Sequence, residues 1–182
     1  MTNTSCPHQP DATHTEKKKT WAEEYRRKVI LPENLEKWAD QMHEKRVKIT
    51  TLNGSFDLLH AGHLQIIYEA SLQGDILILA LNSDSSIKAY KNPARPIIPL
   101  QYRMEMIAAL EFVDYVTWFN ETDPRHILSL IKPQIHVNGS EYGEKCIEAD
   151  VIKKYGGKMH IVNLVPGLST SAVLKKIQSL PA

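Results

Sequence analysis

Two histidines three residues apart, His60 and His63, follow a glycine turn, and this arrangement suits chemistry on phosphate groups. Gly54 lets the backbone turn sharply and approach a ligand closely. The amides of Ser55 and Phe56 can then donate hydrogen bonds to an anion. We expect both histidines in the first turn of a helix, where residues three apart share one face beside the partly positive helix N-terminus. The pattern predicts a site at which negative charge develops on phosphoryl oxygens.

Short apolar runs alternate with amphipathic stretches from residue 47 onward, and these elements must position the histidines. The alternation predicts an α/β fold in which helices cover both faces of a parallel sheet. We expect strands over 47–52, 76–81, 115–118, 135–137 and 159–164. We expect helices over 60–72, 100–110, 124–130, 145–155 and 169–178. Ligands bind beyond the carboxyl ends of such strands, which is where the histidine motif falls.

Further polar segments also follow expected strands. Asn82-Ser83-Asp84 ends the second strand, and Asn138-Gly139 ends the fourth. A loop over 88–99 carries three cations, namely Lys88, Lys91 and Arg95. A solvated charged loop is the default interpretation, but its place directly after a strand end favours contact with an anionic ligand.

The N-terminal quarter of the chain has a different character. Residues 1–20 have almost nothing apolar to bury, so we expect a disordered tail. Residues 21–45 predict a helical extension in two pieces, the second starting at Pro32, which packs on the domain or on a partner subunit. The domain itself is expected to span 46–182.

Composition excludes several classes of protein. The chain has 182 residues and a formal net charge of +1, so nothing indicates a general nucleic-acid or membrane surface. Cys6 and Cys146 lie in unrelated contexts and form no metal-ligand spacing. The longest apolar run is too short to span a bilayer, and the N-terminus lacks a hydrophobic signal core. We expect a cytoplasmic protein with reduced thiols.

The string Thr51-Leu-Asn-Gly-Ser-Phe-Asp-Leu-Leu-His-Ala-Gly-His63 resembles the signature of the cytidylyltransferase-like nucleotidyltransferases. These enzymes transfer a nucleotidyl group from a nucleoside triphosphate to a phosphorylated substrate. Within this superfamily, residues 46–178 are most similar to the adenylyltransferase domain of the bacterial ADP-heptose synthases. The resemblance includes Gly74-Asp75, Asn82-Ser-Asp84, Arg95-Pro-Ile97, Arg103, Val113-Asp114, Gly156-Gly157 and Gly167-Leu-Ser-Thr-Ser171.

The resemblance implies a Rossmann-like fold and a role for each matching residue. It implies that His60 and His63 are catalytic and stabilise the charge on the departing pyrophosphate. The implied nucleotide-binding residues are Asn53, Gly54, Ser55, Phe56, Gly62, Asn82, Asp84, Lys91, Arg95, Ser169, Thr170 and Ser171. Ser169 also suits the N-cap of the last helix. The expected acceptor-binding residues are Asp57, Lys88, Asn138, Gly139 and Glu141.

Two of these roles have structural alternatives. Asp57 suits ordering of the turn better than work as a base, and Arg103 could reach the site or pair with Glu105 or Glu111. The reaction needs no covalent nucleophile. The expected substrates are ATP, which brings Mg²⁺ on its phosphates, and a phosphorylated sugar. No side-chain metal ligands are expected, and the resemblance implies a homodimer.

The chain departs from the heptose enzymes near the end of the fourth strand. Asn138 stands in place of a lysine, Glu141 in place of an aspartate, and Glu148 where glycine is usual. These changes cluster at one end of the sheet, so we expect them to affect the acceptor more than the nucleotide.

Transfer of AMP to heptose 1-phosphate is the leading interpretation, and two alternatives compete with it. One is a cytidylyltransferase acting on glycerol 3-phosphate or a phospho-alcohol. Such relatives carry an arginine ahead of the last helix, where this chain has Leu164 and Val165. The other is a nucleotide-binding regulator without turnover, against which the two retained histidines and the loop cations argue.

Overall fold

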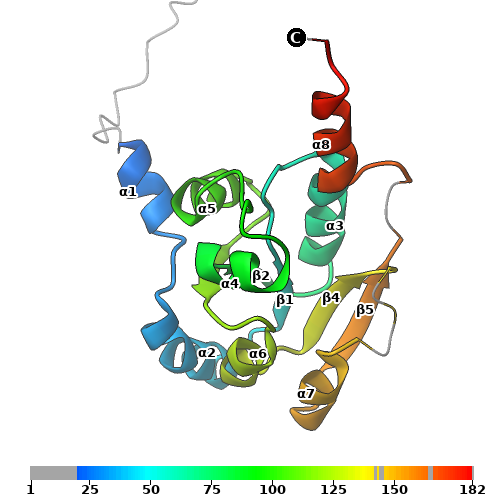
Figure 1. Cartoon of the computed structure of the whole chain (residues 1–182). Coiled ribbons are helices and arrows are strands. Elements are labelled where there is room, and N and C mark those ends of the chain that lie inside the picture. Colours follow the sequence, from blue (N-terminus) through cyan, green and yellow to red (C-terminus); the bar gives the residue numbers. More distant parts are fainter. Residues whose placement is uncertain (1–19, 142, 144–145, 164–165, 182) are drawn as a thin grey trace, which may run out of the picture.

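The computed structural model describes residues 20–141, 143, 146–163 and 166–181, and its centre is a five-stranded parallel sheet (Figure 1). The strands are β1 (Ile49–Gly54), β2 (Ile76–Asn82), β3 (Tyr115–Phe119), β4 (Ile135–Gly139) and β5 (Lys158–Val162). Their order across the sheet is β3-β2-β1-β4-β5, and every neighbouring pair is parallel. The predicted Rossmann-like α/β fold is confirmed.

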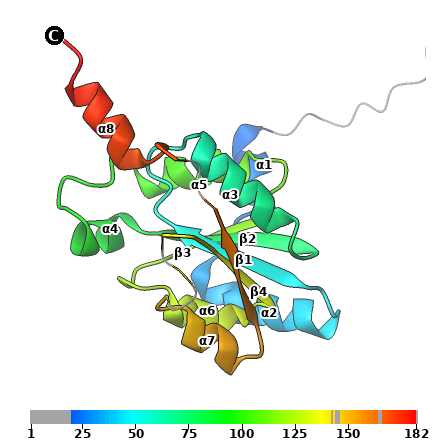
Figure 2. The same cartoon turned by 90° about the vertical axis from the view of Figure 1, so that its right-hand side faces the viewer.

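Helices form a layer on each side of this sheet. The helices of the described residues are α1 (Trp21–Arg26), η1 (Pro32–Asn34, a 3₁₀ helix), α2 (Leu35–Glu44), α3 (Ala61–Ser71), α4 (Asp84–Tyr90), α5 (Leu100–Ala108), α6 (Arg125–Ile131), α7 (Ala149–Lys154) and α8 (Thr170–Gln178), of which α8 projects away from the sheet (Figure 2). Figure 2 shows α3 and α5 over one face and α2, α6 and α7 over the other.

Side chains of the central strands alternate between two apolar cores. Leu77 and Leu79 of β2 pack in the cluster that α3 and α5 cover. Ile78 and Ala80, the residues between and after them, pack in the cluster formed with α2, α6 and α7. Successive strand residues point to opposite faces, so a strand buried on both sides must be apolar throughout. This requirement explains the continuous apolar run that predicted β2.

The sheet topology places the candidate site. After β1, α3 leads to β2 on one side, whereas β4 joins the opposite side of β1 after α6. The strand order therefore reverses at β1 and β4, and the crevice at such a reversal is where ligands bind in open α/β sheets. The glycine turn at the carboxyl end of β1 lies at this point.

The N-terminal helices pack on the sheet of their own domain. The sequence left open whether they would pack there or on a partner subunit. Tyr25 and Val29 contact the core under α5, whereas Leu35 belongs to the core on the other face. Between them the chain passes the free edge of β3. There Ile30 N donates to Val116 O at 2.9 Å, and Val116 N donates to Lys28 O at 2.8 Å. The segment thus extends the sheet by a short bridge beyond β3.

Several predicted boundaries shift. The second helical piece begins at Pro32, as predicted, but the first ends already at Arg26, because residues 28 and 30 form backbone hydrogen bonds with β3 instead of helical ones. The charged loop begins later than residue 88, since Ser83 caps the short helix α4 through its hydroxyl. Helix α7 begins at Ala149 rather than 145, and Cys146–Glu148 form a turn before it.

Some predictions fall outside the described residues. These concern the tail over 1–19 and the Leu164–Val165 pair, and Lys145 itself also lies outside the described residues. Thr20 is described and caps α1, accepting from Glu23 N while the Glu23 carboxylate accepts from Thr20 N. No helix among the described residues is long and apolar enough to cross a membrane.

Candidate active site

A cavity of about 590 Å³ opens at the carboxyl ends of β1, β2 and β4. Most residues predicted for the site line it. They are Asn53, Gly54, Ser55, Phe56, His60, Gly62, His63, Asn82, Lys91, Asn138, Gly139, Glu141, Ser169, Thr170 and Ser171. The cavity is thus built from segments that lie far apart in the sequence and meet at the switch point of the sheet.

The turn after β1 forms the floor of this cavity. Phe56 has a positive φ of 46°, a conformation that costs free energy for a residue with a side chain. A Cβ at position 54 would lie 3.2 Å from the Phe56 ring, so glycine lets that ring fold back over β1. Lys91 Nζ donates to Ser55 Oγ at 2.8 Å, and the Tyr90 hydroxyl lies 2.9 Å from the same oxygen. This places a cation directly beside the turn.

The two histidines stack on each other at the start of α3. Their ring centroids are 3.8 Å apart, with an angle of 25° between the ring planes. His60 is the N-cap residue rather than part of the first turn. Each ring Nδ1 lies 3.4 Å from the backbone N–H of the other histidine, in a reciprocal cap. A Cβ at position 62 would lie 3.1 Å from the His60 ring, so Gly62 allows this packing.

Burial keeps both imidazoles neutral at physiological pH. Desolvation lowers the pKa of His60. It also lowers the pKa of His63 to about 4, helped by the Lys91 charge and by His60 whenever that ring is protonated, and opposed by a hydrogen bond to the Leu58 backbone. A neutral imidazole keeps one N–H donor and one acceptor nitrogen. Because Nδ1 of each ring accepts from the backbone, the Nε2–H of each ring is the group that can donate to an incoming phosphate.

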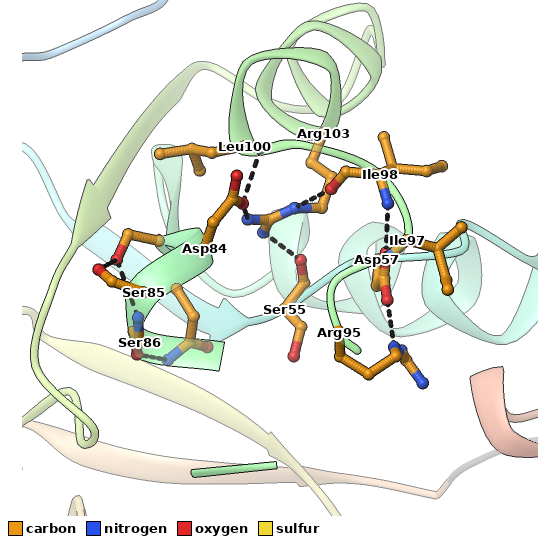
Figure 3. Close-up of polar contacts among 12 residues, drawn as sticks. Ser55, Asp57, Asp84, Ser85, Ser86, Arg95, Ile97, Ile98, Leu100 and Arg103 are labelled. Carbon is orange, nitrogen blue, oxygen red and sulfur yellow. Dashed lines mark hydrogen bonds and ion pairs between the residues drawn. The ribbon is translucent and has the colours of Figure 1, made fainter. Parts of the chain in front are cut away.

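Arg103 holds the turn from behind (Figure 3). Its guanidinium is fully buried and donates to Ser55 O at 2.6 Å, to Ile98 O at 2.9 Å and to Asp84 Oδ1 at 2.8 Å. Asp84 also accepts from Leu100 N at 2.9 Å. Neither predicted glutamate is the partner of Arg103. Asp84 does not line the cavity, so the structure gives it a positioning role instead of nucleotide contact.

Asp57 ties the turn to the loop before α5, as Figure 3 also shows. Its buried carboxylate accepts from Arg95 Nε at 2.5 Å, Ile97 N at 2.8 Å and Ile98 N at 2.9 Å. Burial alone would raise the pKa of Asp57, but the two amides and Arg95 outweigh it and lower that pKa. Neither Asp57 nor Arg95 lines the cavity, because each uses its charge on the other. Asp57 and Arg95 were predicted to contact the ligand, but in this structure they hold the turn after β1 against the loop before α5.

Lys88 is exposed on α4 and does not line the cavity either. It lies one turn before Lys91, and only Lys91 reaches the turn after β1. At the opposite rim, Ser169 caps α8 by accepting from Ala172 N at 3.1 Å, as the helix-start pattern predicted. Thr170 and Ser171 follow it along the cavity wall.

Sequence reasoning assigned no site role to several cavity residues. They are Tyr90, Thr122, Asp123, Pro124, Cys146 and Ile147. Thr122–Pro124 follow β3, so the rule that placed the other motifs at strand ends could have included them. The segment before α7 carries no such signal except the unusual Glu148, which also lines the cavity. Within the described part of the chain, no group of three His, Cys, Asp or Glu side chains could hold a metal ion.

Curated relatives cover most of this chain but exceed it in length. The "Bifunctional protein HldE" of Hahella chejuensis is 38% identical over 153 residues, which are 84% of this chain and 32% of that protein. The protein of the same name from Pseudomonas putida (strain GB-1) is 41% identical over 140 residues, or 76% and 30%. The chain therefore spans about a third of the length of these relatives.

Solved structures give a similar picture. A lipopolysaccharide core biosynthesis protein from Thermoplasma volcanium GSS1 superposes with a TM-score of 0.52 at 30% identity, covering 65% of this chain and 97% of that one. Pantoate-beta-alanine ligase from Francisella tularensis has a TM-score of 0.56 at 18% identity, covering 83% and 74%, and shows the fold alone.

A family model gives the clearest assignment. The model described as cytidylyltransferase-like matches residues 51–178, from the glycine turn to the end of α8. This range contains both histidines, the loop cations and the hydroxyls of the last helix. The chain therefore belongs to the cytidylyltransferase-like family of nucleotidyltransferases, as its histidine motif predicted.

Proposed function

We propose that the protein transfers AMP from ATP to heptose 1-phosphate, forming ADP-heptose and pyrophosphate. The observation that carries the proposal is the pair of stacked, neutral imidazoles beside Ser55 and Lys91 at the turn after β1. Family membership supports nucleotidyl transfer. The choice of ATP and a heptose phosphate rests on the sequence resemblance to the ADP-heptose synthase domain and on the HldE relatives.

In this reaction an oxygen of the acceptor phosphate attacks the α-phosphorus of ATP. The bond from that phosphorus to the bridging oxygen breaks, and pyrophosphate leaves with the electron pair. His60 and His63 donate hydrogen bonds to phosphoryl oxygens as charge moves onto the leaving group. Lys91, which bonds Ser55 of the same turn, adds a full positive charge. The enzyme thus positions and neutralises two anions rather than supplying a nucleophile.

ATP enters this scheme as its magnesium complex, so the metal belongs to the substrate. Ser169, Thr170 and Ser171 present hydroxyls and a helix N-terminus to the phosphates from the opposite rim. Arg103, Asp84, Asp57 and Arg95 act indirectly, by holding the turn and the loop before α5. A homodimer is part of the proposal, and sedimentation of the purified full chain measures it.

The test of the proposal is pyrophosphate release by the full chain. Each of ATP, CTP, GTP and UTP is paired in turn with heptose 1-phosphate, glycerol 3-phosphate and phosphocholine. We expect release with ATP and heptose 1-phosphate, and mass spectrometry should identify ADP-heptose. Preferential release with CTP and a phospho-alcohol would instead establish the cytidylyltransferase alternative. Tight nucleotide binding with no release from any pair would indicate a regulator.

A further inference from the structure

The cavity has two halves that lie on opposite sides of the sheet plane. The histidines and Ser169 come from the side of α3 and α8. Asn53 and Asn138 belong to the other side, because Leu52 and Val137 directly before them are a register pair that packs under α3 and α5. Successive strand residues alternate between faces, so the two asparagines lie next to each other toward α6 and α7. Figure 2 shows these helices beneath the sheet.

Glu148 completes this second half. It is the N-cap residue of α7, yet its side chain makes no capping hydrogen bond. Glu148 and Asn138 are each only 6% exposed, and both line the cavity. A buried carboxylate that neither caps its own helix nor faces solvent needs another purpose.

Three polar atoms in this half lack hydrogen-bond partners among the described residues. They are Asn53 Oδ1, Asn138 Nδ2 and Glu148 Oε2. Buried polar groups in native proteins are normally satisfied, and an unsatisfied one destabilises the fold. Three such atoms in one wall of one cavity therefore point to a ligand that supplies the missing partners. That ligand must donate to two oxygens and accept from one amide nitrogen.

A phosphate does not fit this requirement. It supplies acceptors only, and its charge would face the Glu148 carboxylate in a poorly hydrated site. The described cation of the cavity, Lys91, lies on the β2 side of β1, whereas Asn138 and Glu148 lie on the β4 side. A hydroxyl group fits because it both donates and accepts. Two adjacent hydroxyls on a sugar ring can donate to a carboxylate and an amide oxygen together.

We propose that Asn53, Asn138 and Glu148 form a subsite for adjacent hydroxyl groups of a sugar ring. The proposal rests on the proposed function, which supplies two such rings, the ribose of ATP and the heptose of the acceptor. It gives two of the three unusual residues of this chain, Asn138 and Glu148, one joint role in recognising neutral hydroxyls. Cys146 lies beside both. Burial raises the pKa of its thiol, and this neutral thiol is only a weak hydrogen-bond partner for the Asn138 amide and the Glu148 carboxylate.

The first arm of the test measures nucleotide binding by calorimetry and needs no turnover. ATP, 2′-deoxy-ATP and 3′-deoxy-ATP are titrated into the full-length protein and into its Glu148→Gln variant. If ribose occupies the subsite, loss of a hydroxyl weakens binding to the unaltered protein by roughly ten- to a hundredfold. The loss of affinity for the deoxynucleotide should be smaller in Glu148→Gln. In that variant the carboxylate that would accept from the hydroxyl is already absent, so removing the hydroxyl costs little more.

The second arm measures the acceptor. If heptose occupies the subsite, Glu148→Gln raises the KM or Kd for heptose 1-phosphate by roughly ten- to a hundredfold and leaves the deoxynucleotide penalties unchanged. Asn138→Ala should weaken binding of the same ligand that Glu148→Gln affects, whether the subsite holds the ribose of ATP or the heptose of the acceptor. Asp150→Asn is the matched control, since Asp150 is an exposed carboxylate on α7 and should change neither arm. Thermal unfolding confirms that each variant is folded.

The outcomes separate the two proposals. If Glu148→Gln and Asn138→Ala change neither arm, or if they tighten binding of inorganic phosphate, the hydroxyl subsite is overturned. If the unaltered protein shows no turnover of heptose 1-phosphate, the proposed function fails, and binding of ATP and its deoxy analogues still decides the subsite. If neither ATP nor heptose 1-phosphate binds, both proposals fall.

Discussion

At the scale of single residues, each site histidine has two tasks, because its ring both faces the cavity and caps the backbone of α3. A cap contributes about 1 kcal/mol to stability, whereas a preformed donor to a charge-bearing oxygen is worth ~10²–10³ in rate. The two contributions can be separated by the choice of substitution.

We expect His60→Ala and His63→Ala each to lower kcat by ~10²–10³ with the fold intact. His60→Asn keeps a capping acceptor, so it should retain the melting temperature and still lose most of the rate. Steady-state pyrophosphate release and thermal unfolding give both numbers. Near-normal kcat in an alanine variant would remove that histidine from the catalytic assignment.

The two lysines at the end of α4 provide a matched pair. Lys91 contacts Ser55 at the turn, whereas Lys88 is exposed and outside the cavity. Lys91→Met should raise the KM for ATP about tenfold or more, because a charge-assisted contact to phosphate is lost. Lys88→Met removes the same charge from the same helix and should change the KM less than twofold. Equal effects would mean that the lysines act only through long-range charge, which added salt would screen.

Sequence alone predicted the residues that line the cavity better than the residues that hold the turn in place from behind. Each support depends on a partner far along the chain: Asp57 on Arg95, and Arg103 on Ser55 O. Nothing in the spacing of Arg103, Glu105 and Glu111 shows that the guanidinium turns toward Asp84 instead. A motif identifies residues near a ligand, whereas ion pairs between loops depend on the folded path of both.

At the scale of elements, strands β1 and β4 are joined by a buried histidine. His136 of β4 is fully buried and bonds Thr51 of β1 through Nδ1 at 2.7 Å. Its Nε2 has no partner among the described residues. Burial lowers the pKa of His136 to about 3, so the folded protein keeps it neutral.

This burial predicts acid sensitivity. Between about pH 6.5 and 3 the unfolded chain binds a proton at this position and the folded chain does not. The contribution of His136 to the free energy of unfolding is therefore complete above pH 6.5. It decreases by up to about 1.4 kcal/mol for each pH unit as the pH is lowered through this window. Urea unfolding at pH 7 and pH 4.5 measures the free energy of unfolding. Its decrease between these two pH values should be smaller for His136→Asn than for the unaltered protein. The exposed His126→Gln should behave like the unaltered protein, and equal losses in all three would contradict the prediction.

Helices α4 and α5 are clamped to the turn after β1 by one guanidinium. Arg103→Met leaves the carbonyl groups of Ser55 and Ile98 without their donor, at a cost of about 1–3 kcal/mol for each buried group. Arg103→Lys should recover little, because a single ammonium cannot replace the three-way fork. We expect lower unfolding free energy and lower kcat in both variants. Arg27→Met, which breaks only the exposed pair with Glu24, should change neither by much.

The element pattern was the part best predicted from sequence. All five strands were anticipated because each is an apolar run between polar turns, and β2 is buried on both faces. The short helix α4 was not, since its seven residues include two serines and show no helical apolar period. Its stability comes from the Ser83 cap and from Ile87 packed in the core, which only the tertiary structure reveals.

At the scale of the whole molecule, the N-terminal segment belongs to both layers. Its first helix packs on the core under α5 and its second on the core of α6, with the β3 edge covered between them. A chain that begins at residue 46 should therefore lose several degrees or more in melting temperature. A chain that begins at Thr20 keeps the α1 cap and should match the full chain in melting temperature and rate. Equal melting temperatures of the two shortened chains would show that residues 20–45 do not contribute to the stability of the fold.

The same wrapping has a consequence for synthesis on the ribosome. Residues 20–45 leave the ribosome well before the residues they contact, since the His43 ring bonds Ile131 O and Lys28 Nζ bonds Leu110 O and Val113 O. At typical elongation rates this delay is on the order of ten seconds. During that interval Trp21, Tyr25 and Trp38 have no native surface to cover them. This segment can thus fold only after partners that are made later, so its apolar side chains depend on a chaperone more than those of an element whose partners have already been made.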